Sequence, residues 1–334
     1  MKKTILVLFI FICLFSSSLF ASSLASREDV KEFIDEMVSE HKMNKKSLQI
    51  LFNKTKIRQD IIDLMNRPAE KVKPWYEYKK IFLTDSRVNK GLTFWKENKE
   101  VLAYAKKVYG VPEEIIVAII GVETFYGRIT GRHRVIDALS TLAFDYPKRA
   151  RFFRNELKQY LILCKEQKID PLSKKGSYAG AMGYGQFMPS SYQHYAVNFD
   201  GKGIKDIWNN TRDAIGSVAN YFKQHGWLLE QPVVVAAILD AKKNKNTPDY
   251  NNRKIKPKIT LKTFAAKGIN SNLSSQSPDM KAALFMLEEK TGPTYWLSLN
   301  NFYVISRYNH SHMYSMVVNL LSQKLKAAYT KKAI

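Results

Sequence analysis

The segment that most restricts the fold of this chain is a helix that is apolar on every side. Pro112, Glu113 and Glu114 suit the start of a helix, because proline lacks a donor that the first turn would leave unused and acidic side chains favour the positive end of the helix dipole. The residues that follow, "IIVAIIGV" at 115–122, surround the helix axis instead of forming one stripe. A helix of this kind is buried among other helices. The sequence therefore predicts a helical core that contains the segment 113–124.

One carboxylate, Glu123, ends this apolar run. Desolvation by apolar neighbours and the negative end of the helix dipole both favour the neutral form of the carboxyl group and raise its pKa. A carboxyl group that stays protonated near neutral pH can serve as a general acid. The alternative is a structural glutamate bonded to a nearby arginine such as Arg128, and this segment alone favours neither interpretation.

The rest of the chain has mostly helical patterns, with one region of different composition. One helical face near the start carries apolar residues at three- and four-residue steps, namely Val30, Phe33, Ile34, Met37 and Val38. Between 232 and 260 the segments "PVVVAAILDA" and "KPKITLKTF" are rich in β-branched residues, which predicts a small β-containing insertion. We expect a further helical segment after it, a strand over "NFYVISRYN" and a closing amphipathic helix that carries Met313, Met316, Val317, Leu320 and Leu321.

These patterns predict a mainly helical, α+β protein. Its expected parts are a helical lobe at 26–105, a core at 106–231, the β-containing insertion at 232–280 and a C-terminal segment at 281–334. The chain is long enough to bury a sizeable core.

The first 25 residues have the pattern of an export signal. Two lysines precede the apolar run "TILVLFIFICLF", and small residues follow it. The run is too short for a comfortable membrane span, and Cys13 within it lacks the preceding small residues of a lipid-attachment signal. We therefore expect a periplasmic protein without a lipid anchor. Its one remaining cysteine, Cys164, is expected to be a buried hydrophobic residue and forms no intramolecular disulfide.

The charge of the chain favours anionic partners. The net charge is +23, which attracts polyanions. Because the export signal directs the chain out of the cytoplasm, we expect its anionic partners to be polymers of the cell envelope and not nucleic acid. The sequence also contains no nucleic-acid-binding motif.

A second candidate site is the glycine-rich segment "GSYAGAMGYGQFMPSSY" at 176–192. Its glycines leave stretches where a ligand or another backbone can approach closely. Ser177, Tyr184 and Gln186 between them could form hydrogen bonds with sugar hydroxyl or acetamido groups. The alternative is a tight connection without a ligand, and the segment matches no phosphate-binding loop.

Four long motifs in order resemble the membrane-bound lytic murein transglycosylase B family of peptidoglycan-cleaving enzymes. They are "YGVPEEIIVAIIGVETFYGRITGRHRVIDALSTLAFDYPKRARFFRNEL", "GSYAGAMGYGQFMPSSYQHYAV", "DAIGSVANYFKQHGW" and "NNFYVISRYNHSHMYSMVV". The resemblance runs from about residue 75 to 325. It implies a goose-lysozyme-like helical catalytic core, flanked by an α lobe and a small β-containing lobe, with a cleft for the glycan strand.

The resemblance also implies roles for individual residues. Glu123 falls on the single catalytic acid and base of the family. Ser177 and Gln186 match residues that line the cleft near this acid, and Tyr308, Asn309 and Tyr314 fall on cleft residues of the C-terminal segment.

The implied reaction accounts for the lack of a second well-placed carboxylate. Ordinary glycosidases need two carboxylates, and the other candidates, Asp137 and Asp145, suit a helix cap or an arginine partner better. In the family, the acid protonates the glycosidic oxygen after N-acetylmuramic acid. The acetamido group of that sugar stabilises the developing cation, and the acid then takes the proton of the C6 hydroxyl, which closes a 1,6-anhydro ring. A lysozyme-type hydrolase of peptidoglycan or chitin and a non-catalytic glycan-binding protein are the alternatives.

No cofactor is expected. Some family members bind calcium in a loop at the position of "NFDGKGIKDIWN". Here Lys202 places an ammonium where a carboxylate belongs, and Asn209 replaces the bidentate glutamate of an EF-hand-like loop. His310 and His312 lack acidic or cysteine partners nearby and predict no metal site. The expected partner is the glycan strand of peptidoglycan, bound by a monomer. The sequence identifies no partner protein of cell-wall synthesis or division.

Overall fold

The computed structural model describes residues 23–333, apart from 68–72, 244–249, 253 and 276. The predicted export signal, with Cys13, lies outside the described residues except for its last few positions. The chain divides into two compact units, one up to Lys54 and one from Thr55 onward. Within the described residues, no helix combines the length and the apolar character that a membrane crossing needs.

The first unit is a short helical pair. It contains η1 (Leu24–Ser26), α1 (Glu28–His41) and α2 (Lys45–Lys54). The predicted apolar face of α1 is confirmed, because Val30, Phe33, Ile34 and Met37 are all buried. The ring of Phe33 meets that of Phe52 edge to face, with 5.9 Å between the centroids. The two helices therefore pack through the face that the sequence predicts.

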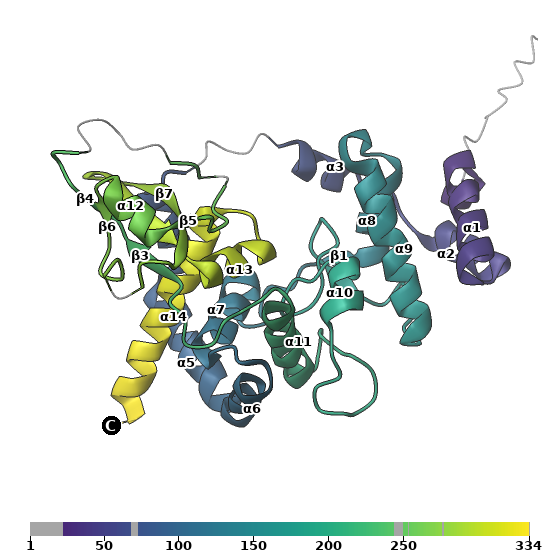
Figure 1. The fold of residues 1–334 in the computed structure, drawn as a ribbon. Coiled ribbons are helices and arrows are strands. Elements are labelled where there is room, and N and C mark those ends of the chain that lie inside the picture. Colours follow the sequence, from purple (N-terminus) through teal and green to yellow (C-terminus); the bar gives the residue numbers. More distant parts are fainter. Residues whose placement is uncertain (1–22, 68–72, 244–249, 253, 276, 334) are drawn as a thin grey trace, which may run out of the picture. The chain divides into compact units, whose positions relative to one another are not determined.

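The second unit is mainly helical (Figure 1). Before the β region it contains α3 (Gln59–Asn66), α4 (Trp75–Phe82), α5 (Asp85–Glu97), α6 (Lys99–Tyr109), α7 (Glu113–Thr124), β1 (His133–Arg134), α8 (Val135–Phe144), η2 (Pro147–Arg149), α9 (Ala150–Glu166), β2 (Lys175–Gly176), α10 (Pro189–Tyr195) and α11 (Thr211–Gln224). After it come α13 (Asn300–Tyr308) and α14 (His312–Ala333). The helices predicted at 26–105 thus fall in both units, α1 and α2 in the first and α3 to α6 in the second.

Helix α7 is buried on all sides, as predicted. Ile116, Val117, Ile119 and Ile120 have no exposed surface. The helix contacts α5, α6, α11 and α14, so that neighbours from both halves of the chain surround it (Figure 1). Each buried isoleucine or valine contributes roughly 1.5–3 kcal/mol of hydrophobic stabilisation. Helix α7 therefore forms the centre of the helical core of the second unit.

The β region is a small antiparallel assembly. It contains β3 (Val234–Ala236), β4 (Ile238–Leu239), β5 (Ile259–Thr260), α12 (Leu261–Ala266), β6 (Ile269–Asn270), β7 (Lys281–Glu289) and β8 (Gly292–Ser298). Four strands form a sheet in the order β3-β8-β7-β5, and β4 pairs with β6. A separate hydrophobic cluster that includes Leu261, Phe264, Leu284 and Leu297 holds α12 against the sheet. The predicted β-rich texture after residue 232 therefore marks a lobe with its own core.

Two of the predictions for this region are wrong. The expected helical segment after the Ser/Asn-rich stretch is the hairpin of β7 and β8. Its alanine, leucine, methionine and glutamate residues are good helix formers, but the segment is covered on both faces. Leu284 lies in the α12 cluster, while Phe285 stacks on Phe302 of α13 at 4.8 Å. Packing on both faces of a strand overrides local propensity.

The expected strand over "NFYVISRYN" is helix α13. Aromatic and β-branched residues favour a strand, but the buried residues Asn301, Phe302, Val304 and Ile305 recur at helical spacing. Asn301 is fully buried and its amide nitrogen donates to Leu228 O at 2.8 Å. The Asn301 amide on the buried face of α13 therefore has a hydrogen-bond partner from a distant segment of the chain.

Candidate active site

Glu123 is the last residue but one of α7, and the chain turns sharply just after it. Phe125 and Tyr126 both have left-handed backbone conformations, with φ of 52° and 62°. Such conformations cost about 1–3 kcal/mol for residues with a side chain and persist where the surrounding structure imposes them. The turn ends α7 directly beyond the carboxylate, so that Glu123 lies at the edge of the apolar core.

Thr124 connects this turn to the glycine-rich segment. Its hydroxyl donates to Tyr184 O at 2.9 Å and accepts from Gly127 N–H at 2.9 Å. A side chain at Gly127 would meet the Tyr184 ring, because its Cβ would lie 2.1 Å from that ring. The turn that follows Glu123 and the glycine-rich segment 176–192 are therefore in contact.

Among the described residues, the carboxyl group of Glu123 has one hydrogen-bond partner, Tyr314 on the first turn of α14. The Tyr314 hydroxyl donates to Glu123 Oε1 at 2.5 Å, across 191 positions of sequence. Tyr314 is itself buried, so its ring is fixed by packing of α14 against α7. The closing helix therefore orients the carboxyl group that α7 supplies.

Burial changes the protonation of this group. Desolvation raises the pKa of Glu123 from 4.5 to about 7, and the hydrogen bond from Tyr314 opposes this rise. Burial, and then the negative charge of Glu123, also raises the pKa of Tyr78, Tyr308 and Tyr314. Three phenol groups that stay protonated therefore surround a carboxyl group that exchanges its proton near neutral pH.

The structure excludes the ion pair that the sequence left open for Glu123. The Arg128 guanidinium lies over the ring of Phe125, 5.5 Å from its centroid. Among the described residues, Glu123 forms no ion pair within 4.0 Å, and no other acidic group contributes to its pKa shift. Glu123 is therefore not a structural ion-pair residue.

Asp137 and Asp145, the two other carboxylates considered in the sequence, have structural roles. Asp137 is buried and accepts from Arg134 Nε at 2.7 Å and from Lys56 N–H at 3.0 Å, which confirms the arginine partner. Asp145 is the C-terminal cap of α8.

The glycine-rich segment holds Tyr308 against the site. The Tyr308 hydroxyl donates to Gly185 O at 2.5 Å. A Cβ at Gly185 would lie 2.8 Å from that hydroxyl oxygen, so only glycine permits this approach. The glycines here serve close contact between backbone and side chain, and they bring α13 to the segment beside Glu123.

The remaining predicted residues keep unused hydrogen-bonding groups. Ser177 Oγ accepts from Ala181 N–H at 3.0 Å, and no described residue accepts its hydrogen. Gln186 donates through Nε2 to Thr130 O and Gly183 O, which leaves its Oε1 available. Asn309 is exposed and uses Oδ1 to accept from Ser311 N–H at 3.2 Å. These free atoms are of the kind that bind sugar hydroxyl and acetamido groups.

Sequence reasoning missed Tyr78 on α4. It was one aromatic residue among several near Trp75, and nothing in its local pattern set it apart. The structure places it within electrostatic range of Glu123 and Tyr314. Only the packing of α4 against α14 brings it there.

The loop at Asn198–Asn209 does not fit a calcium ion. Asn198 Oδ1 is buried without a partner, but both oxygens of Asp200 already accept, from Lys202 N–H and from Asn210 Nδ2. Asn209 donates its amide to Asp206 at 3.0 Å where a bidentate carboxylate is needed. No group of three acidic, histidine or cysteine residues suited to a metal occurs in the described part of the chain. Hydrogen bonds within the loop close it instead.

Comparison with known proteins gives concordant matches. The family model described as "Transglycosylase SLT domain" matches residues 25–323. The membrane-bound lytic murein transglycosylase B of Escherichia coli (strain K12) is 44% identical over 316 residues, which cover 91% of this chain and 84% of that protein.

Solved structures agree with this match. The Escherichia coli lytic transglycosylase Slt35, determined in complex with calcium, is 42% identical with a TM-score of 0.83, over 91% of this chain and 95% of that chain. SltB3 from Pseudomonas aeruginosa, in complex with NAG-anhNAM-pentapeptide, is 29% identical with a TM-score of 0.79, over 90% of this chain and 79% of that chain.

Removal of the Tyr314 hydroxyl tests the geometry of the site. The bond from Tyr314 favours the ionised carboxylate, so Tyr314→Phe should raise the pKa of Glu123 above about 7, by about one unit for a hydrogen bond to a charged group. Carbon-detected NMR titration of the glutamate side chains measures this pKa. Tyr308→Phe is the control, because its hydroxyl bonds to Gly185 O and its removal should shift the value less. A lower or unchanged pKa in Tyr314→Phe would contradict the assignment.

Proposed function

This chain belongs to the transglycosylase family with the SLT domain and is a peptidoglycan-cleaving lytic transglycosylase, and we propose that Glu123 is its single catalytic acid and base. The observation that carries the proposal is the raised pKa of Glu123, about 7, at the end of a buried apolar helix. A general acid works best when its pKa lies near the working pH. Glu123 has this property without a second carboxylate among the described residues that shift its pKa.

The first half of the reaction uses the protonated form of Glu123. The acid donates its proton to the oxygen of the bond between N-acetylmuramic acid and N-acetylglucosamine, and that bond breaks as the muramic acid develops positive charge. The acetamido group of the same sugar stabilises this charge. Such assistance from the substrate replaces the second carboxylate that most glycosidases need.

The second half uses the carboxylate. Glu123 takes the proton of the C6 hydroxyl of the muramic acid, and the C6 oxygen bonds to C1 to form the 1,6-anhydro ring. The carboxylate then holds a proton again, so that the cycle closes without consumption of water. Tyr314 stabilises the ionised form between the two halves, because its hydroxyl donates to Glu123 Oε1.

The proposal places the glycan against the free polar groups beside Glu123. Ser177 and Gln186 are the proposed contacts from the glycine-rich segment, and Tyr308, Asn309 and Tyr314 those from the C-terminal helices. We expect the chain to act on glycan strands as a monomer.

Replacement of Glu123 tests its role. Glu123→Gln keeps the size and hydrogen bonding of the side chain but removes the transferable proton. Because one residue serves both halves of the reaction, we expect turnover of purified peptidoglycan to fall by about a hundred- to ten-thousandfold or more, with retained binding to glycan strands. Glu114→Gln is the matched control in the first turn of the same helix, where the carboxylate pairs with Lys326 at the opposite end from Glu123. Wild-type turnover in Glu123→Gln would place the acid elsewhere.

Product masses distinguish the reaction from hydrolysis in the same assay. The wild type should release muropeptides that end in 1,6-anhydro-N-acetylmuramic acid and are lighter by one water than hydrolysis products. Reducing ends would show that water is activated by a second carboxylate, and binding without any release would indicate a non-catalytic glycan-binding protein.

We also propose that the mature protein is exported and periplasmic. The support is the charged, apolar and small-residue order of the first 25 residues. Cell fractionation with N-terminal sequencing should recover a chain without the first twenty-odd residues outside the membrane fraction. An acylated cysteine at the N-terminus of a membrane-bound form would overturn this proposal.

For the loop at Asn198–Asn209 we propose that no calcium is needed. Lys202 and Asn209 occupy ligand positions, so a chelator should leave the melting temperature nearly unchanged, since an ion that does not bind adds no stability. The double variant Lys202→Asp and Asn209→Glu restores the ligand types and serves as the positive control. A rise of several degrees for the wild type in millimolar calcium would contradict the proposal.

A further inference from the structure

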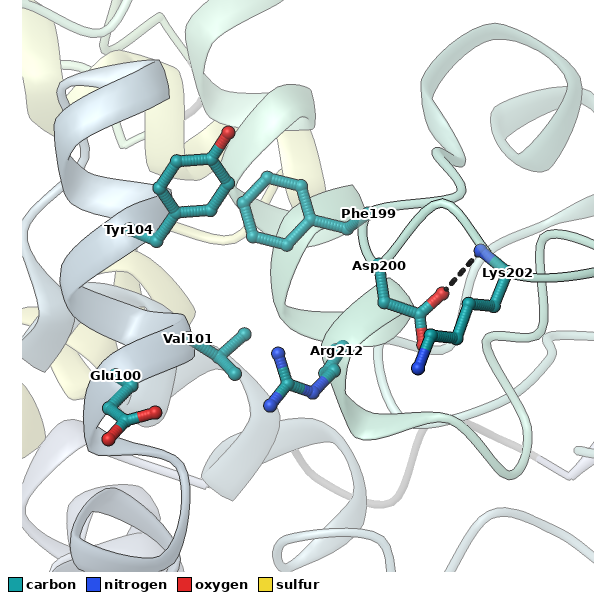
Figure 2. A pocket seen from close by; sticks show the side chains of 7 residues that line it. All are labelled: Glu100, Val101, Tyr104, Phe199, Asp200, Lys202 and Arg212. Carbon is teal, nitrogen blue, oxygen red and sulfur yellow. Dashed lines mark hydrogen bonds between the residues drawn. The ribbon is translucent and has the colours of Figure 1, made fainter.

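A second concave site lies between α6 and the loop that leads into α11. Its volume is about 480 Å³, within the range of small-ligand sites. It is lined by Glu100, Val101, Tyr104, Phe199, Asp200, Lys202 and Arg212. Figure 2 shows Tyr104 and Phe199 side by side at one end, and the Arg212 side chain extending from the start of α11 toward Val101 and Glu100. None of these residues is part of the site around Glu123.

One wall of this pocket is a supported aromatic surface. The rings of Tyr104 and Phe199 have centroids 5.2 Å apart and are inclined by 33°. Phe199 also packs against the protein interior. Its ring centroid lies 5.8 Å from that of Tyr109, and a Cβ at Gly216 would lie 2.3 Å from the Phe199 ring. Tyr104 is 54% exposed. A fixed and exposed apolar wall of this kind suits the aliphatic part of a ligand.

The charged groups of the pocket are available. Within the described part of the chain, Arg212, Lys202 and Glu100 form no ion pair within 4.0 Å. Asp200 is different, because its two oxygens accept from Lys202 N–H and Asn210 Nδ2. Two cations and one carboxylate therefore face the pocket with unused hydrogen-bonding capacity.

The balance of these charges selects the class of ligand. Two acidic and two basic side chains line the pocket, whereas the whole chain carries +23. A simple polyanion would be repelled by Glu100 and Asp200 here and would bind better elsewhere on the surface. A ligand that carries a carboxylate and an ammonium close together matches both signs.

We propose that this pocket binds the peptide stem of peptidoglycan through a free amino-acid end group. The carboxylate of that group meets Arg212 and Lys202, its ammonium meets Glu100, and its aliphatic chain lies on Tyr104 and Phe199. The choice of peptidoglycan rests on the proposed function. A diamino acid in the stem offers both charges on one carbon only while its amine is not cross-linked, so the pocket distinguishes free stems from cross-linked ones.

The test uses a free stem tetrapeptide, alanyl-γ-glutamyl-diaminopimelyl-alanine, titrated into the mature chain and followed by amide NMR shifts at 199–212. Two modified peptides remove one charge each, by N-acetylation of the side-chain amine or amidation of the side-chain carboxyl. Each change should weaken binding about two- to fivefold, as for solvated ion pairs. The double variant Arg212→Gln and Lys202→Gln should lose the response to amidation only, and Glu100→Gln the response to acetylation only. Arg151→Gln, an exposed arginine on α9, is the matched control and should keep both.

This pattern differs from that of a misfolded variant, which would weaken all three peptides alike. Absence of binding by the wild type, or equal responses in all variants, would overturn the proposal. The peptide contains no glycosidic bond, so Glu123→Gln should bind it as the wild type does. Loss of anhydro products with the binding pattern retained would count against the proposed function alone, and the reverse result would count against this pocket alone.

Discussion

The burial of one carboxyl group at the end of an apolar helix is the constraint on which the rest of the structure depends. Helix α7 is surrounded by α5, α6, α11 and α14, and its burial desolvates the carboxyl group of Glu123. The resulting rise in pKa to about 7 disfavours the ionised form in the folded state. A group with a raised folded-state pKa costs stability as the pH rises from 4.5 through 7. The fold tolerates this cost because the buried aliphatic residues of the same helix contribute far more.

The C-terminal helices α13 and α14 bring the chain back to the end of α7 that carries Glu123. Tyr314 donates to Glu123 from α14, and Tyr308 on α13 is held by Gly185 O. The carboxyl group, the glycine-rich segment and the two C-terminal helices thus meet through three hydrogen bonds, with Thr124 as the third connection. Of these bonds, the one from Tyr314 orients the carboxyl group, and the other two hold the segments around it together.

The loop before α11 is closed by its own hydrogen bonds. Asp200, Asp206 and Asp213 are all occupied by N–H donors of the loop and its neighbours, so the loop closes by hydrogen bonds. Lys202 and Arg212 then remain free of ion pairs in the described residues and line the same pocket as Tyr104 and Phe199. The loop therefore supplies two cationic side chains to the lining of the pocket beside α6.

The sequence by itself determined the buried helix 113–124 and the mainly helical class, because composition and periodicity act locally. It left open whether Glu123 is an acid with a raised pKa or the partner of an arginine. The motifs also indicated Ser177, Gln186, Tyr308, Asn309 and Tyr314. Only the tertiary structure decided that α13 is a helix and β7 a strand, because packing on both faces overrides propensity. It also decided that Arg128 lies on Phe125 and that Tyr78 lies near Glu123, because contacts between distant segments depend on how helices pack, which no local pattern records.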